Sequence, residues 1–322
     1  MIKKECFTAE WIEQVSSELH YNDKNLIEKV IRALSLLEML VKAGCPLVFK
    51  GGTALMLILG KSAHRLSIDI DLICPPGTNI EDYLKSFADF GFINLELVER
   101  KQRDDADIPK SHSKFFYQIA YRNDTDAQSY ILLDVLYEDI HYFRTQQIAI
   151  NCPFIRLEGK PLMVTVPSAE DILGDKLTAF APNTTGIPYY RNGRSCSMEI
   201  AKQLYDVGRL FENVSDLQIT KEAFRKIAVV ELSYRSFGTD IGQVFNDIRQ
   251  TALCISTRGK AGEGDFDLIQ DGIIRVKSFM YKQRYLIDHA IIDAARAAYL
   301  ATLIEKGINE IESYSNNPAD TQ

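Results

Sequence analysis

The chain has 322 residues, of which 46% are hydrophobic and 25% charged, and it carries a formal net charge of −7. These values are ordinary for a globular protein of one or two domains with a substantial core. The negative charge argues against broad, non-specific binding of nucleic acid, although a local basic patch would suffice for a particular RNA.

We expect no membrane-spanning segment, because charged residues interrupt every apolar run before it is long enough to cross a bilayer. The N-terminal segment lacks the apolar core of a secretion signal, so the expected location is the cytoplasm. The six cysteines are scattered without a Cys-x-x-Cys pair, which argues against a zinc or redox motif.

The first half of the chain predicts a mixed β-sheet with helices. Residues 26–41 repeat apolar side chains at helical spacing, which predicts an amphipathic helix. An apolar run at 46–49 predicts a strand, followed by a helix-like segment at 54–59. The remaining elements expected here are strands at 68–73, 93–98, 115–121, 130–137 and 147–150 and a helix at 79–90. The sheet is expected to span about 46–166.

After Pro167 the pattern becomes mainly helical. The expected elements are helices at 168–180 and 287–305, a loop at 182–196 and a polar, frayed tail at 313–322. We therefore predict an α/β (α+β) fold with two domains, 1–166 and 167–322, that face each other across a cleft.

A glycine-rich turn, Lys50-Gly51-Gly52-Thr53, lies between the predicted strand at 46–49 and the following helix. Glycine lets the backbone approach a phosphate closely, and a helix start presents free N–H groups with positive polarity. The turn therefore suits a phosphate, and the alternative is a plain strand-to-helix connection.

Two aspartates, Asp69 and Asp71, alternate with apolar residues in the segment 68–73. On a strand they would share one face, roughly 7 Å apart along the chain. Two carboxylates on one stiff strand can bind hard divalent cations, as in two-metal sites. The alternative is an edge strand with a solvated acidic face.

A third carboxylate, Asp134, lies within the apolar run 130–136. Such a run predicts a strand buried on both faces, where a lone aspartate is costly unless it is paired or binds metal. Asp134 is therefore a candidate third metal ligand or general base. The alternative is a carboxylate paired with a nearby arginine or lysine.

These motifs together resemble a known family. Gly-Gly-Thr at 51–53, followed by Arg-x-Ser-x-Asp-x-Asp at 65–71, is similar to the AbiEii/AbiGii toxins, which are nucleotidyltransferases related by fold to the DNA polymerase beta superfamily. The resemblance covers about residues 25–215. It implies a site made of Gly51, Gly52, Thr53 and Ser67 at the phosphates of an NTP and of Asp69 and Asp71 at Mg²⁺ or Mn²⁺.

The resemblance extends to two later motifs. The helix at 168–180 supplies Lys176, which is expected to meet the triphosphate, and the segment 202–207 supplies Asp206. Gln203 departs from the family, which often has aspartate there. Either Asp206 or Asp134 would accept the proton of the acceptor. From the residues alone, the favoured interpretation of Lys176 is snorkelling, and Lys202 and Asp206, spaced i and i+4, could form a surface ion pair.

The resemblance implies a toxin of a toxin–antitoxin system that transfers a nucleotidyl group from an NTP to RNA, such as a tRNA 3′ end, and that has a cognate antitoxin. The segments 189–194 and 275–284 mix cations with aromatics, and their cations Arg191, Arg194, Arg275 and Lys282 are candidates for gripping RNA. For both segments the alternative is a loop or a solvated helix face. The competing functions are a small-molecule nucleotidyltransferase of the antibiotic-modifying kind and a non-catalytic nucleotide-binding protein.

Overall fold

The computed structural model describes residues 1–98, 110–121, 127–214, 216–234 and 240–311. The predicted tail at 313–322 lies outside the described residues. Within them, no helix is long and apolar enough to cross a membrane.

The described helices include nine α-helices and several short 3₁₀ turns. The α-helices are α1 (Ala9–Glu18), α2 (Lys24–Lys42), α3 (Gly51–Leu59), α4 (Ala169–Ala179), α5 (Ser197–Phe211), α6 (Leu217–Ser233), α7 (Ile241–Ser256), α8 (Phe266–Val276) and α9 (Ile287–Lys306). The 3₁₀ turns are η1 (Lys4–Phe7), η2 (Gly60–Ser62), η3 (Ile80–Tyr83), η4 (Phe87–Phe90) and η5 (Lys277–Phe279).

The described strands form three sheets. They are β1 (Val48–Lys50), β2 (Ile70–Cys74), β3 (Asn94–Val98), β4 (Lys110–Gln118), β5 (Gln128–Tyr137), β6 (Thr145–Ala149), β7 (Met163–Pro167), β8 (Tyr190–Arg191) and β9 (Arg194–Ser195). The main sheet has five strands in the order β1-β2-β5-β4-β3. The pair β2–β5 is parallel and the other neighbouring pairs are antiparallel, so the predicted mixed sheet is confirmed.

Strand β5 alternates between the two faces of the sheet. Ile131, Leu133 and Val135 are buried, whereas Asp134 between them is partly exposed. The prediction of a strand buried on both faces is therefore wrong. The apolar run includes residues of both faces, and only the packing of the helices decides which face is covered.

Two other sequence predictions are corrected. The helix expected at 79–90 is a pair of short 3₁₀ turns, η3 and η4. Two side chains of α2 donate hydrogen bonds to carbonyl groups at the end of the segment 79–90. Ser35 donates to the Phe90 carbonyl, and Arg32 donates to the Gly91 carbonyl. The apolar side chains of the segment are buried in the same core as α2, and two short turns achieve this burial without a continuous helix. The sheet is also not continuous to 166, because β6 and β7 pair separately.

The segment expected as a loop at 182–196 contains a small hairpin, β8–β9. Its turn is Asn192-Gly193, with φ of 51° and 73°. Two residues with positive φ suit the tight turns that match the twist of paired strands, and Asn-Gly is the favoured sequence for them.

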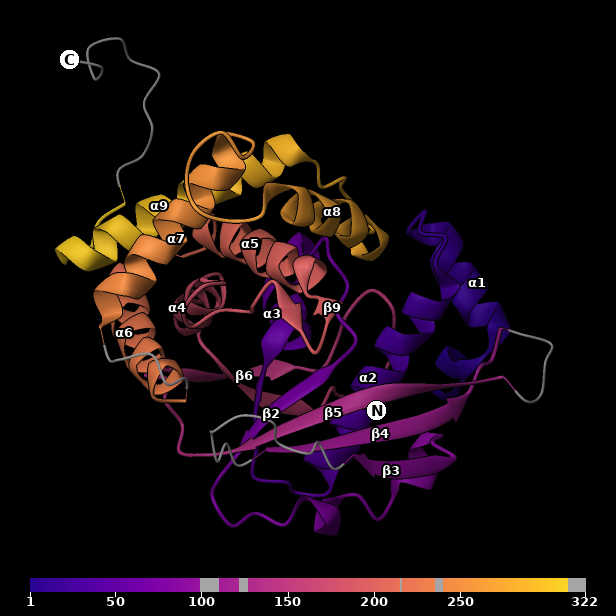
Figure 1. Cartoon of the computed structure of the whole chain (residues 1–322). Coiled ribbons are helices and arrows are strands. Elements are labelled where there is room, and N and C mark those ends of the chain that lie inside the picture. The colour runs from indigo at the N-terminus through magenta and orange to yellow at the C-terminus, as the bar shows by residue number, and fades with distance from the viewer. Residues whose placement is uncertain (99–109, 122–126, 215, 235–239, 312–322) are drawn as a thin grey trace.

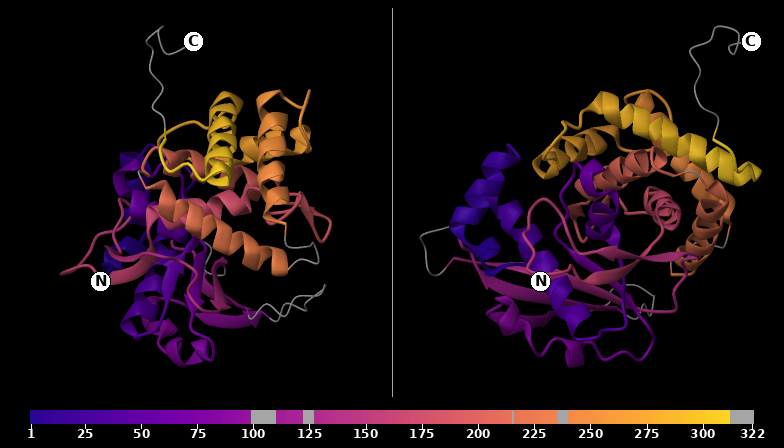
Figure 2. Two further views of the ribbon diagram at one scale, coloured as in Figure 1. Left: turned by 90° about the vertical axis from the view of Figure 1, so that its left-hand side faces the viewer. Right: turned by 180° about the vertical axis from the view of Figure 1, so that it is seen from behind.

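Two hydrophobic clusters account for most of the buried interior. One joins α1, α2 and the inner face of the main sheet, and the other joins α4 to α9. Helix α3 contributes to both, because Met56 packs in the first cluster and Leu55 in the second. Figure 1 shows α3 between the sheet and the C-terminal helices, and Figure 2 shows the sheet and helices α7–α9 on opposite sides of the molecule. The domain boundary at 166/167 stays a prediction.

Candidate nucleotidyl-transfer site

Three predicted acidic residues come together on neighbouring strands. Asp71 is on β2 and Asp134 is its partner in the parallel register with β5, while Asp69 directly precedes β2. Burial raises the pKa of Asp71 to about 7, and the charges of Asp69 and Asp134 add to this shift. Burial also raises the pKa of Asp69, and Asp134 adds to it. Three carboxylates are thus held against their mutual repulsion.

The glycine turn lies directly beside these acids. Strand β1 ends at Lys50, which pairs with Asp71 across the sheet, and α3 begins at Gly51. Gly51 has a φ of 77°, and a Cβ placed there would lie 2.0 Å from Asp71 Oδ2. The first N–H groups of a helix have no partner within it, so the start of α3 presents donors next to the carboxylates.

The rest of the turn connects the start of α3 to the loop before β2. The Thr53 hydroxyl donates a hydrogen bond of 2.7 Å to the Asp69 carbonyl. A Cβ on Gly52 would lie 2.7 Å from Ser67 Oγ. Thr53 therefore holds the backbone of Asp69, while Gly52 and Ser67 lie together beside it.

A substitution of Gly51 tests this close approach. Gly51→Ala should lower nucleotidyl transfer strongly, because the new methyl group must displace the Asp71 carboxylate. Gly44→Ala is the matched control, since Gly44 has a nearly equal φ of 75° but nothing within 4 Å of its Cβ position. Both changes should cost about 1–2 kcal/mol of folding free energy from backbone strain. Equal transfer rates in the two variants, measured with purified folded protein, would contradict the assignment.

Asp206 is buried between two cations. Its carboxylate accepts hydrogen bonds from Arg65 Nε (3.0 Å) and Nη2 (2.8 Å), and Lys176 Nζ lies 3.0 Å from Oδ2. Burial alone would raise the pKa of Asp206, but Arg65 and then Lys176 outweigh it and hold the pKa below its ordinary value. The predicted residues Lys176 and Asp206 are therefore joined, and Arg65 links them to the loop that carries Ser67 and Asp69.

Lys176 does not snorkel to the surface. It is only 8% exposed and lies 3.0 Å from Asp206, and its charge opposes the rise that burial causes in the pKa of Asp71. This position suits a cation that meets the phosphates of a nucleotide.

Lys202 is a site residue whose role the sequence did not reveal. No ion pair joins it to Asp206, the i+4 partner considered from the sequence; its Nζ lies 3.7 Å from the centroid of the Phe279 ring. Burial and the nearby charge of Arg65 lower the pKa of Lys202 to about 8, and the charge of Asp69 opposes the shift. The i, i+4 spacing could have placed Lys202 on the same helical face as Asp206, but not next to Asp69.

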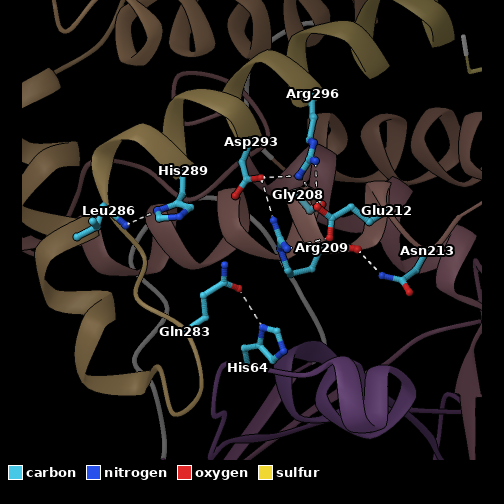
Figure 3. A network of polar contacts seen from close by, with 10 residues as sticks. All are labelled: His64, Gly208, Arg209, Glu212, Asn213, Gln283, Leu286, His289, Asp293 and Arg296. Carbon is cyan, nitrogen blue, oxygen red and sulfur yellow. Dashed lines mark hydrogen bonds and ion pairs between the residues drawn. The ribbon is translucent and has the colours of Figure 1, made fainter. Parts of the chain in front are cut away.

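A segment after α8 holds the loop that precedes the acids. Leu66 N–H donates to the Phe279 carbonyl (2.8 Å), and Tyr281 N–H donates to the His64 carbonyl (3.0 Å). His64 Nδ1 also lies 3.1 Å from Gln283 Oε1, as Figure 3 shows. The C-terminal half thus fixes the loop 63–67, although it lies more than 200 residues away in sequence.

Helix α5, which carries Lys202 and Asp206, is anchored to α9 at its other end. The buried Asp293 lies 3.5 Å from Arg209 Nη2 and 3.1 Å from Arg296 Nη1 (Figure 3). A Cβ on Gly208 would lie 2.0 Å from Asp293 Oδ1, so the two helices are in close contact here. This network sets the position of α5 without touching the acids.

The partner of Asp134 is a histidine rather than the arginine or lysine considered from the sequence. His112 of β4 is opposite Asp134 in the register, and its Nδ1 contacts Asp134 Oδ1. The His112 side chain is 12% exposed and that of Asp134 34%. The apolar pattern of β4 could not identify this contact, because it depends on the register between two strands.

The four cations proposed for RNA are spread over separate elements. Arg191 and Arg194 lie in the β8–β9 hairpin, and Arg275 lies in the last turn of α8, 3.7 Å from Asp271. Lys282 donates to the Lys61 carbonyl (2.9 Å). The segment 275–284 is not one helix face, since α8 ends at Val276 and η5 follows.

The donor chemistry of the acids fits a magnesium-type ion. In the described part of the chain, no group of three or more His, Cys, Asp and Glu side chains converges closely enough to hold a metal by itself. Magnesium, however, usually binds through one or two carboxylates together with substrate phosphates and water. The repelling carboxylates of Asp69, Asp71 and Asp134 supply such a partial set of oxygen ligands.

Comparison with known proteins identifies the class of this protein. The family described as "Nucleotidyl transferase AbiEii toxin, Type IV TA system" matches residues 34–296. The match covers most of the chain, so the protein belongs to this family of nucleotidyltransferase toxins, and the resemblance inferred from the sequence is confirmed. No curated protein matches the chain.

Several solved structures are similar to this one at low sequence identity. JHP933 from Helicobacter pylori is 16% identical over 87% of this chain and 94% of its own, with a TM-score of 0.45. A putative nucleotidyltransferase from H. pylori is 17% identical over 88% and 94%, with a TM-score of 0.43. The nucleotidyltransferase toxin MenT4 from Mycobacterium tuberculosis is 14% identical over 91% and 89%, with a TM-score of 0.49.

Proposed function

We propose that this protein is a metal-dependent nucleotidyltransferase toxin that transfers a nucleotidyl group from an NTP to the 3′ end of an RNA, such as a tRNA, in the cytoplasm. The observation that carries the proposal is the position of Asp69, Asp71 and Asp134 beside the Gly51 turn, where the charge of the buried Lys176 also acts on Asp71. Carboxylates for a cation and donors for a phosphate are what this reaction needs.

In the proposed site, Asp69 and Asp71 would hold Mg²⁺ or Mn²⁺, and Asp134 lies beside them as the base. When bound, the ion neutralises charge on the phosphates and orients the reacting oxygens. Without it, burial and then the charges of Asp69 and Asp134 disfavour the ionised form of Asp71 and raise its pKa. An ion and the nucleotide that it binds would therefore be taken up together.

The triphosphate is assigned to the start of α3. The N–H groups of Gly51 and Gly52 face it, with the Ser67 hydroxyl at one side, as the close packing of Gly52 and Ser67 supports. Lys176 approaches from α4 and contributes a compact positive charge. Lys202 of α5 adds a second charge near Asp69.

We assign Asp134, rather than Asp206, as the base that accepts the proton of the acceptor hydroxyl. Both oxygens of Asp206 are engaged by Arg65 and Lys176, which also lower its pKa. Asp134 is partly exposed and keeps Oδ2 available, since His112 contacts Oδ1. In the proposed step the acceptor hydroxyl loses its proton to Asp134, its oxygen bonds to the α-phosphorus, and the bond to pyrophosphate breaks.

The identity of the acceptor is tested by supplying each labelled NTP with total tRNA, and separately with aminoglycosides. We expect label on RNA, growth arrest when the protein is expressed, and relief of that arrest by a cognate antitoxin. Asp82→Asn is the matched control for changes in the site, because Asp82 is an exposed aspartate in η3. Label on the small molecule instead would establish the antibiotic-type alternative, and nucleotide binding without turnover would establish the binding-protein alternative.

A further inference from the structure

The sheet face that carries the acids continues beyond them along β4 and β5. On this face the antiparallel register places His112 opposite Asp134 and, farther along, Lys114 opposite Leu132 and Phe116 opposite Tyr130. Alternate residues of a strand share a face, so Tyr130 is on the same side as Asp134. The four-residue separation corresponds to roughly 14 Å along the strand. This face of the sheet therefore leads from Asp134 to the aromatic pair Phe116 and Tyr130.

Tyr130 is an exposed aromatic residue with cations close to its ring. It is 40% exposed, and its ring centroid lies 5.7 Å from that of Phe116. Lys29 Nζ lies 5.5 Å and Lys114 Nζ 5.6 Å from the Tyr130 centroid. Aromatic faces with adjacent cations are the features that bind single-stranded nucleic acid, through base stacking and phosphate contacts.

The two lysines differ in how they are held. Lys114 lies 3.2 Å from Glu96, whose side chain is 49% exposed, and exposed ion pairs of this kind contribute little and can be replaced. Lys29 comes from α2, and among the described residues no carboxylate lies within ion-pair distance of it. Burial lowers the pKa of Lys29, and the charge of Asp69 opposes this shift, so the positive charge beside Tyr130 is also felt at the acids.

We propose that Tyr130, Phe116, Lys29 and Lys114 form a platform for the single-stranded 3′ end of the RNA acceptor. A base a short way back from the reacting hydroxyl stacks on Tyr130, and Lys29 and Lys114 contact the adjoining phosphates. An anionic acceptor whose hydroxyl reaches Asp134 needs positive charge beside its phosphates. On the Tyr130 side of Asp134, Lys114 supplies it from β4 and Lys29 supplies it from α2. This inference rests on the proposed transfer to RNA.

The platform is tested with Tyr130→Ala and Tyr130→Trp in the full-length protein. With a short single-stranded RNA as acceptor, Tyr130→Ala should raise the KM for RNA roughly tenfold or more, because a stacked base is lost. Tyr130→Trp should keep a KM close to that of the parent, since it retains an aromatic face. The KM for NTP should be unchanged in both, because Tyr130 is far from the start of α3. A purely structural role for Tyr130 would change both KM values.

Tyr190→Ala is the matched comparison, because Tyr190 is also an exposed tyrosine, 57% against 40% for Tyr130, and lies on the β8–β9 hairpin beside Arg191. If Tyr190→Ala raises the KM for RNA and Tyr130→Ala does not, RNA lies over the hairpin and the platform is wrong. If the parent labels no RNA but modifies a small molecule, the proposed acceptor fails and the platform fails with it. Labelling of RNA by the parent protein therefore distinguishes a wrong acceptor from a wrong platform.

The salt dependence of RNA binding provides a second test of the platform. Lys29→Gln should weaken RNA binding and lower the slope of log affinity against log salt by about one, because one fewer counterion is released. Binding is measured by fluorescence anisotropy with the same labelled RNA. An unchanged slope would remove Lys29 from the platform.

Discussion

Asp71→Asn and Asp69→Asn should each lower the rate of nucleotidyl transfer by about three orders of magnitude. Losing a metal-binding carboxylate removes several kcal/mol of transition-state stabilisation, and each 1.4 kcal/mol is about a factor of ten in rate. The fold should survive, because both side chains lie on the face opposite the buried Ile70 and Leu72. Single-turnover transfer with saturating Mg²⁺ and NTP measures the effect, and Asp82→Asn is the control. Transfer at the parental rate in both variants would rule out this assignment.

The pH dependence of stability offers an independent check in protein without metal. The pKa of Asp71 is raised in the folded state from its ordinary value of 3.8 to about 7. A raised pKa means that the folded state retains a proton that the unfolded state has lost, so this contribution is present below pH 3.8 and is lost as the pH rises through about 7. Asp71→Asn should therefore flatten the fall in unfolding free energy across this range, and added Mg²⁺ should stabilise the parent more than the variant.

Asp206→Ala should destabilise the folded protein by about 3–5 kcal/mol, because it leaves the buried charges of Arg65 and Lys176 without their partner. Denaturant unfolding monitored by circular dichroism measures this change. Asp82→Ala is the control: Asp82 belongs to an exposed ion pair with Lys85, for which the expected change is about 0–1 kcal/mol. Transfer should fall as well, since Arg65 would no longer hold the loop before Asp69.

The contribution of Asp206 to the unfolding free energy should depend on pH in the opposite sense to the contribution of Asp71. Arg65 and Lys176 hold the pKa of Asp206 below its ordinary value, so its contribution is present above the unfolded pKa and is lost as the pH falls through the folded one. The difference between parent and variant should shrink in acid. A constant difference at every pH would mean that the loss comes from packing rather than from the charge.

Local sequence patterns were sufficient for the central strand and turn of the site. The alternation around Asp69 and Asp71 and the glycine pair at 51–52 depend on neighbours in sequence. The strand β2 forms there but begins at Ile70, just after Asp69, and α3 already begins at Gly51. The mixed sheet and the helical C-terminal half followed from periodicity in the same way. The resemblance carried by these motifs was specific enough to predict the family.

Tertiary structure alone decided which residues surround the acids. Asp206 was predicted as a candidate base or surface ion pair, but the packing of α5 against α4 and the loop 63–67 buries it between Arg65 and Lys176. The contact of His112 with Asp134 depends on the register of β4 against β5, and the contact of Leu66 with Phe279 joins segments far apart in sequence. Periodicity records which side of its own element a residue occupies. It contains no information on which distant element will cover that side, because this is set by how the helices and the sheet bury their apolar faces together.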